Sequence, residues 1–333
     1  MASKQTVSIK TISEYTGLSI ATVSRVINKS GSFTPETYNK VQEAVRQLGY
    51  VPNAMARGLR KNSIPLVGII VPDIINEFFS RIVLYIQLEM AKHGYSVFIC
   101  NTNESEDQEL MYLDSLQTMR ISGLVCISGH DAEDERWPNV PTVYIDRNPA
   151  RRIQHSSAIE SDNVSGGFQA GRELCRRGCE RIALLRDVRP VSTVTKREQG
   201  YRQALADAGI AVDDSLILTT DKISEKTAYD AVAYALQSGK RFDGIFCTTD
   251  WLAMGALRAL YNVHLTVPRD VRVVGYDDIS VASYSAMPIT TIRQDTDEMS
   301  RLAVEELILM MEGKPPRRDH WIVPVSLIRR ETT

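Results

Sequence analysis

The chain of 333 residues lacks any apolar run long enough to cross a membrane. Its longest, residues 64–72, falls far short of the roughly 20 residues that a bilayer requires. It also lacks the apolar stretch of an export signal behind its first methionine, so we expect it to remain in the cytoplasm. Its five cysteines are an odd number and none forms a CxxC pair, which favours buried free thiols over disulfides or a metal site.

The signatures of common enzyme classes are missing as well. The sequence contains no GxSxG elbow, no phosphate-cradling P-loop, no GxGxxG after a strand and no HExxH. Carboxylates and five histidines are present, so composition alone leaves acid–base chemistry open. Because no motif supports catalysis, we expect a protein that is not an enzyme and that carries no cofactor and no metal.

Charge is distributed unevenly along the chain. The net charge is −2, yet residues 1–61 hold nine lysines and arginines against three acids, which makes that segment +6. The remainder is therefore −8. With 43% hydrophobic and 24% charged residues, the chain is typical of a folded protein of two or three domains. A basic head before an acidic body indicates that the head meets a polyanion, although a solvated basic face would give the same charge.

The basic head has the spacing of three helices. Residues 9–28 predict two short helices broken at Gly17, with Ser19 placed to cap the second. A third helix is expected from Pro35 onward, because proline is favoured at the first helical position. The second helix turns an apolar stripe inward at i, i+3 and i+4, namely Val23, Val26 and Ile27.

The opposite face of that second helix suits a DNA groove. Ile20 and Ala21 let the helix enter and contact thymine methyl groups, and Arg25 can fork onto guanine. Short donors around them suit phosphate oxygens: Ser8, Ser19, Thr22, Ser24 and Asn28. On spacing alone, a three-helix packing domain without a DNA role stays open as the alternative.

Strand-like and helix-like segments alternate from residue 66 onward. Strands are expected at 66–71, 96–100, 123–128, 182–185, 216–218 and 243–248, and helices at 78–93, 106–119, 197–207 and 226–237. Residues 122–126 echo residues 243–247, which indicates an internal repeat. The alternation predicts parallel sheets covered by helices, and the repeat predicts two similar doubly wound lobes instead of one large sheet.

Polar residues follow most of the predicted strands. In open parallel sheets, ligands bind beyond the carboxyl ends of the strands. The residues at these ends are Asp73, Asn76, Asn101, Asn103, Asp146, Arg147, Asp162, Asn163, Thr249, Asp250, Asp277 and Asp278. Each alone is as well explained as a helix cap or a turn residue. Together they form an edge rich in acceptors and arginines that suits a hydroxyl-rich molecule such as a sugar.

These segments resemble a known family. Residues 11–28 are similar to the DNA-binding head of the lactose/galactose repressor family of bacterial transcription factors, and residues 49–59 look like its hinge. Further family motifs match residues 71–79, 144–147, 197–201, 249–256, 275–278 and 290–294, so the resemblance covers nearly the whole chain. It implies an all-α helix-turn-helix head joined by a hinge helix to a periplasmic-binding-protein-like α/β body of two lobes.

The resemblance also assigns roles to the hinge. A segment as short as residues 53–60 is not a stable helix alone in water, so it would order on DNA. In the family, two hinge helices of a dimer lie in the minor groove, where the leucine that matches Leu59 wedges into a base step. The hinge residues implied to contact DNA are Asn53, Ala56, Arg57 and Leu59.

In the body, the resemblance places several residues around an effector. Asp146, Arg197, Thr249 and Asp277 fall at effector-contacting positions, Phe78 and Phe79 on the opposite wall, and Asn76 and Arg147 at the cleft edge. This sequence departs from the family where Glu77 replaces a common proline, Ile223 a stacking aromatic residue, and Thr249 a frequent asparagine. Trp251 is expected to supply a replacement stacking face, although a tryptophan on a helix is as often core.

The implied domains are residues 1–52 for the head and 53–63 for the hinge and linker. The first lobe takes 64–162 plus 293–323, and the second 163–292 plus 324–333. The chain would cross between the lobes near residues 162–165, 290–293 and 324, and such linkers form a natural hinge for closure.

The sequence thus predicts a DNA-binding regulator of transcription, acting as a repressor on a double-stranded, pseudo-palindromic operator. A small-molecule effector, a sugar or sugar phosphate, would control its affinity for that operator. No leucine heptads follow the body, so a homodimer is expected instead of a tetramer, with no membrane partner. Two alternatives stay open: a solute-binding protein and a sugar-acting enzyme without a DNA role.

Overall fold

The computed structural model describes residues 7–28, 30–50, 65–128, 137–149 and 151–333. The chain divides into two compact units, residues 1–64 and 65–333, which we call the head and the body. Among the described residues, no helix is both long and apolar enough to cross a bilayer. The predicted hinge contacts Asn53, Ala56, Arg57 and Leu59 lie outside the described residues.

Three helices form the head: α1 (Ile9–Thr16), α2 (Ile20–Ile27) and α3 (Pro35–Leu48). Each begins behind a hydroxyl side chain that accepts a hydrogen bond from the amide three residues later, namely Ser8, Ser19 and Thr34. Gly17 ends α1 with a φ of +69°, which glycine adopts at little cost. Ile12, Val23, Val26, Val41 and Ala44 form the core, and Ile27, the third residue of the predicted stripe on the second helix, packs against it partly buried.

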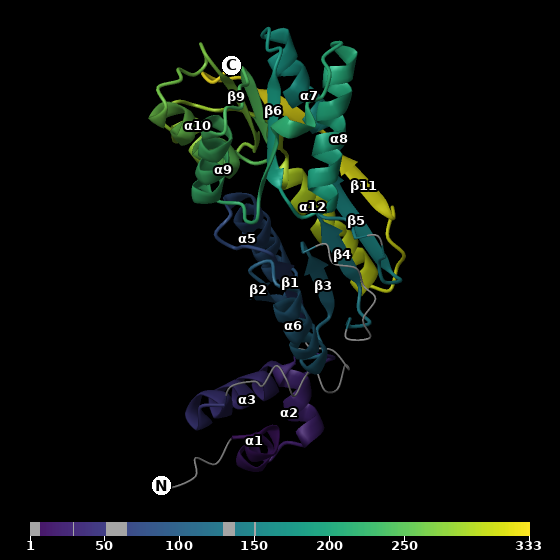
Figure 1. Cartoon of the computed structure of the whole chain (residues 1–333). Helices are drawn as coiled ribbons and strands as arrows, with labels where there is room; N and C mark the ends of the chain where they lie inside the picture. The colour runs from purple at the N-terminus through teal and green to yellow at the C-terminus, as the bar shows by residue number, and fades with distance from the viewer. Residues whose placement is uncertain (1–6, 29, 51–64, 129–136, 150) are drawn as a thin grey trace. The chain divides into compact units, whose positions relative to one another are not determined.

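The body's first sheet has the order β11-β5-β4-β3-β1-β2 and is parallel throughout (Figure 1). Its strands are β1 (Leu66–Val71), β2 (Ser96–Asn101), β3 (Gly123–Cys126), β4 (Thr142–Ile145), β5 (Ser156–Ser161) and β11 (His320–Val323). The helices α5 (Glu77–Lys92) and α12 (Thr296–Met311) cover one face, and α6 (Glu106–Thr118) covers the other. With its helices this sheet forms the first lobe.

The second sheet repeats the same order as β12-β10-β9-β8-β6-β7. Its strands are β6 (Ile182–Asp187), β7 (Ile217–Thr220), β8 (Gly244–Cys247), β9 (Arg272–Asp277), β10 (Thr290–Gln294) and β12 (Val325–Ile328), of which β12 alone pairs antiparallel. The helices α9 (Glu225–Gln237) and α10 (Asp250–Asn262) pack on one face and α7 (Asn163–Arg176) and α8 (Ser192–Asp207) on the other, while α11 (Ser280–Tyr284) is short. The predicted pair of doubly wound lobes is confirmed.

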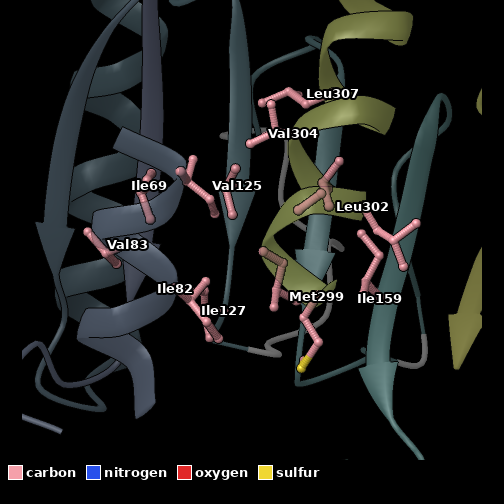
Figure 2. Packing of buried hydrophobic residues seen from close by; sticks show 14 of the residues in the cluster. Ile69, Ile82, Val83, Val125, Ile127, Ile159, Met299, Leu302, Val304 and Leu307 are labelled. Carbon is pink, nitrogen blue, oxygen red and sulfur yellow. The ribbon is translucent and has the colours of Figure 1, made fainter. Parts of the chain in front are cut away.

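The core of the first lobe lies between its sheet and two helices that are distant in sequence. Figure 2 shows Ile82 and Val83 of α5 and Met299 and Leu302 of α12 directed toward the strands. Sheet residues such as Ile69 meet them, and all are at most 4% exposed. Because a strand buried on both faces favours apolar residues along its length, the central strands β1 and β3 are continuous apolar runs of mostly buried residues.

The chain crosses between the lobes at Asp162, Asp295 and Pro324. The second of these crossings lies later than residues 290–293, where it was expected. Strand β10 runs to Gln294, because Arg293 pairs with Asp277 of β9 and with Ser326 of β12. Arg293 and Gln294 therefore belong to the second lobe, and the predicted start of the first-lobe segment at 293 was wrong by two residues.

Candidate functional site

One face of α2 in the head is exposed. Val23 and Val26 are buried, whereas Ile20 on the opposite side is 47% exposed. A shallow hollow on this exposed side is lined by Ile20, Ala21, Ser24, Arg25, Ser30 and Gly31. The face thus combines apolar groups with a guanidinium, which is the set of side chains that contacts base edges in the major groove.

Arg25 is the cation of this face. It packs on the turn behind α2, since a Cβ at Gly31 would stand 3.2 Å from Arg25 Cδ. At the start of α2, the Ser19 and Thr22 hydroxyls lie 2.9 Å apart, so both are held at the helix end. The predicted DNA contacts of the head lie on α2 and at the helix ends. Ser8 is at the start of α1, and Asn28 is at the end of α2.

A cavity of about 700 Å³ lies between the two lobes of the body. The first lobe contributes Asn76, Phe79 and Glu104 to its wall, and the second contributes Arg189, Ile223 and Trp251. Its charged lining consists of four acids and two bases: Asp73, Glu104, Asp221, Glu225, Arg189 and Lys222. The size fits a small molecule, and the position beyond the carboxyl ends of strands is the one expected for this topology.

Three of the predicted effector residues form a buried group that we call the central cluster: Asp146, Arg197 and Asp277. Arg197 Nη2 of the second lobe lies 4.0 Å from Asp146 Oδ1 of the first lobe, and Arg197 Nη1 lies 3.7 Å from Asp277 Oδ1. The guanidinium also donates to Asn163 Oδ1 at 2.8 Å and to the Thr248 carbonyl at 2.7 Å. The central cluster therefore joins the two lobes.

Burial governs the protonation of both carboxyl groups in the central cluster. It raises the pKa of Asp277 to about 7, with Asp146 adding to the rise and Arg197 and Gln294 opposing it. Burial likewise raises the pKa of Asp146, against the charges of Arg197 and Arg147. Asp146 Oδ1 is buried and accepts no hydrogen bond from the described residues. The cluster thus has one guanidinium for two carboxyl groups, and Asp146 Oδ1 can accept a hydrogen bond from a ligand.

We expect the contribution of Asp277 to the stability of the body to fall as the pH rises from about 4 to about 7. Folded Asp277 keeps its proton up to a pKa of about 7, whereas the unfolded chain releases it near 3.8, so the cost of ionising the buried carboxyl grows across this window. Relative to the parent, Asp277→Asn should gain roughly 2 to 4 kcal/mol between pH 4 and 8, at about 1.36 kcal/mol per pKa unit. Urea unfolding followed by tryptophan fluorescence measures this difference, and parallel pH profiles would contradict it.

Glu104 links the lobes at the cavity wall. Its carboxylate accepts two hydrogen bonds of 2.7 Å from Arg147 of its own lobe and lies 2.9 Å from Arg189 Nη1 of the other. Arg189 is held in turn by Asp187. Burial raises the pKa of the Glu104 carboxyl, but the hydrogen bonds and charges of the two arginines outweigh it and lower that pKa overall. Both arginines are thus neutralised within the protein.

A further contact between the lobes uses Glu77, which stands where proline is common in the family. Glu77, at the start of α5, accepts hydrogen bonds from the amide and the hydroxyl of Ser280 at 2.9 and 2.6 Å. Ser280 begins α11 in the second lobe. A proline at position 77 has no carboxylate to accept these hydrogen bonds, so the glutamate gives this chain an additional bridge between the lobes.

Strained backbone gathers at the same strand ends. Positive φ values occur at five non-glycine residues there: Asn103, Glu104, Asp146, Asp277 and Asp278. Such conformations cost free energy and persist where surrounding contacts fix them, often at binding sites. The side chains of Asp146 and Asp277 are therefore presented in fixed directions.

Seven of the nine predicted effector residues lie at the cavity wall, in the central cluster or next to both. Asn76, Phe79 and Trp251 line the cavity, and Asp146, Arg197 and Asp277 form the central cluster. Arg147 lies between them, because its guanidinium pairs with Glu104 and stands 5.8 Å from the centre of the Phe79 ring.

The structure places the remaining two predicted residues elsewhere. Phe78 is 3% exposed in the first-lobe core, one helical turn before Ile82, and does not line the cavity. Thr249 caps α10 by accepting the Leu252 amide at 3.2 Å. The side chain of Phe78 thus packs in the core and that of Thr249 caps a helix, although the resemblance had assigned both to the effector.

Sequence reasoning missed Glu104, Arg189 and Lys222 as cavity residues. Glu104 directly follows Asn103, which the strand-end pattern had included, so a wider window behind each strand would have found it. Arg189 carries no comparable signal, because its importance depends on a partner in the other lobe.

Comparisons with known proteins agree with this geometry. Residues 8–53 match the family of bacterial regulatory proteins called the lacI family, and residues 172–333 match the periplasmic binding protein-like domain. The ribose operon repressor of Escherichia coli K12 is 34% identical over 90% of this chain and 92% of its own length.

Two solved structures extend the comparison. The Lac repressor dimer bound to operator and the anti-inducer ONPF has a TM-score of 0.86 and 26% identity over 99% of both chains. A regulator of the lacI family from Enterococcus faecium with bound ribose has a TM-score of 0.71 and 26% identity, covering 80% of this chain and 98% of its own. The prediction of a transcription regulator, as opposed to an enzyme, is confirmed, and the chain belongs to the lacI family of bacterial regulatory proteins.

Proposed function

We propose that this regulator is a repressor that binds a pseudo-palindromic operator as a homodimer in the cytoplasm and that a neutral sugar, bound between its lobes, sets its affinity for that operator. One observation carries the effector part. The central cluster joins both lobes and leaves the buried Asp146 Oδ1 without a hydrogen-bond donor from the described residues, and Arg147, the residue after Asp146, pairs with Glu104 of the cavity wall. A sugar hydroxyl can donate a hydrogen bond to Asp146 Oδ1, and a sugar is small enough to fit the cavity.

The charges around the cavity favour a neutral sugar over a sugar phosphate. Four acids and two bases line it, and Arg147 and Arg189 already pair with Glu104 and Asp187. A phosphate would have to displace these carboxylates and meet a net negative wall, which Coulomb repulsion disfavours. Apolar groups at Phe79, Ile223 and Trp251 offer faces for the C–H groups of a sugar ring.

Linkage connects this site to DNA. A sugar that contacts Asp146 of one lobe and Asp277 of the other prefers one lobe arrangement, and it shifts operator affinity by its preference for that arrangement. A coupling of about 1 to 3 kcal/mol gives a 5- to 150-fold response. The relatives support this scheme, since one is named a ribose operon repressor and another was solved as a dimer on its operator.

A paired panel tests the proposal on the full chain. Thermal unfolding is measured with D-ribose, sucrose and cellobiose, each beside a phosphorylated counterpart such as ribose 5-phosphate, and binding to selected inverted-repeat duplexes is then measured with each stabilising compound. We expect a neutral sugar to raise the melting temperature and change operator affinity. Tighter binding of the phosphorylated counterpart, or no preference for inverted repeats over random duplex, would overturn it.

Arg25→Ala is expected to cost about 1 to 3 kcal/mol of discrimination at one base pair of each half-site. Arg25 is the exposed cation of the α2 face, and a bidentate contact to guanine is lost with it. Selection of binding sites from a random library measures the change in base preference. Lys40→Ala on α3, also exposed, is the control and should lower affinity without altering that preference. An unchanged selected sequence for Arg25→Ala would remove Arg25 from base recognition.

A further inference from the structure

We propose that Lys196 is a positioning residue for the effector site, because its salt bridge with Glu160 ties α8 of the second lobe to the first lobe. We call this Lys196–Glu160 pair the clasp. The proposal rests on the proposed function, since it takes Arg197 to be an effector-binding residue.

The clasp is a direct contact between the lobes. Lys196 Nζ donates to Glu160 Oε1 and Oε2 at 2.6 Å each. Glu160 lies on β5 in the first sheet and is 2% exposed, whereas Lys196 lies on α8 and its side chain is one-third exposed. His320 of the neighbouring strand β11 places Nε2 2.6 Å from Glu160 Oε1. Glu160 thus belongs to the first lobe, where His320 is its near neighbour, and the lysine comes from the second.

The clasp and the central cluster act on adjacent strands. Lys196 and Arg197 are consecutive in α8, and their first-lobe partners are Glu160 on β5 and Asp146 directly behind β4. The 4.0 Å between Arg197 Nη2 and Asp146 Oδ1 is too long for a hydrogen bond, so this pair does not set its own spacing. The two short hydrogen bonds of the clasp, which lies one residue earlier in α8, set the distance between Arg197 and Asp146.

Helix α8 is rigid enough to transmit this constraint. A Cβ at Gly200 would lie 1.9 Å from the Val164 carbonyl oxygen, and one at Gly167 would lie 1.9 Å from that of Arg197. The backbones of α7 and α8 are therefore in direct contact, and α8 cannot shift within its own lobe. By holding α8, Lys196 therefore holds the whole second lobe against the first.

Distances between spin labels test the clasp without any ligand. Labels at Met111→Cys on α6 and Tyr234→Cys on α9 occupy exposed positions on different lobes, in a Cys175→Ala background because Cys175 is the half-buried thiol. We expect Lys196→Met to lengthen or broaden the distance distribution and Lys196→Arg to restore it. Lys226→Met is the matched control, since that lysine pairs with Asp230 within one helix, and it should leave the distribution unchanged.

A folding defect must be separated from loss of the clasp. Lys196→Met leaves a buried carboxylate with His320 alone, whereas the double variant Glu160→Gln/Lys196→Met removes both charges and should fold like the parent. The double variant should still show the altered distances. A distribution identical to that of the parent in both the single and the double variant would overturn the proposal.

D-ribose binding, measured on the same full-length variants, separates this proposal from the proposed function. We expect Lys196→Met to weaken ribose binding about tenfold or more and Lys196→Arg to recover most of it. Arg197→Met should abolish binding. If Arg197→Met binds ribose as the parent does, the proposed effector site is wrong. If Arg197→Met loses ribose and Lys196→Met does not, the positioning role alone is wrong, and the label distances decide the clasp whichever sugar binds.

Discussion

Arg197→Met is expected to abolish the effector response and to lower the free energy of unfolding of the body by about 3 to 5 kcal/mol, the usual cost of breaking a buried ion pair from one side. The substitution removes the cation that faces both Asp146 and Asp277, each at most 5% exposed. It also removes the donors to Asn163 and Thr248. Asp277 then lacks a facing cation and Asp146 keeps only the charge of Arg147, which already pairs with Glu104, and the sugar loses a contact that joins the lobes.

Tryptophan fluorescence reports this unfolding, because all three tryptophans, Trp137, Trp251 and Trp321, lie in the body. Arg202→Met is the matched control on the same helix. Arg202 pairs with Glu198 and Asp214 in a partly exposed setting, so its loss should cost no more than about 1 kcal/mol.

Operator binding is expected to survive in Arg197→Met at temperatures where the body remains folded, because the head has its own core. A normal effector response in this variant would exclude Arg197 from the site. Equal destabilisation by Arg202→Met would show that the burial of the central cluster does not add to the free energy of unfolding lost in Arg197→Met.

Gly200→Ala is expected to destabilise the body by about 3 kcal/mol or more, although helix propensity favours alanine over glycine by about 1 kcal/mol. The added Cβ would meet the Val164 carbonyl oxygen at 1.9 Å and the Phe168 nitrogen at 2.6 Å. Both are backbone atoms, so no side chain can turn aside and the helices α7 and α8 must separate.

Gly171→Ala provides a graded comparison for Gly200→Ala in urea unfolding. It lies at the same helix contact, but its Cβ would meet the Ala204 Cβ at 2.9 Å, a much shallower overlap than the 1.9 Å at Gly200. We expect a clearly smaller loss. A stabilised Gly200→Ala variant would show that propensity, and not close approach, governs this position.

Sequence predicted the fold well where local signals are strong. Apolar runs marked several of the parallel strands, and Ser19 and Pro35 marked helix starts that the structure confirms. The start of α8 was misplaced at 197 instead of 192, because Val191 stands at the N-cap and makes no side-chain hydrogen bond there. Without a capping side chain, the first turn of this helix carries no local signal.

The site was harder to predict, because residues that directly follow a strand can have different roles. The side chain of Thr249 satisfies an amide at the start of α10, and that of Asp146 faces a cation of the other lobe, yet both follow a strand in the same way. The Glu104–Arg189 and Glu160–Lys196 contacts form only when two separately folded lobes meet. Periodicity and spacing along one lobe contain no information about such pairs.

The order of strands also constrains how the protein is made in the cell. Each sheet receives an outer strand from the same late segment, β11 for the first and β12 for the second. A ribosome must therefore deliver nearly the entire polypeptide before either lobe can close its hydrophobic layer, and α12, which fills the first lobe, emerges after most of the second. The head, whose helices end at Leu48, can acquire its structure early, while the body assembles once translation is almost finished.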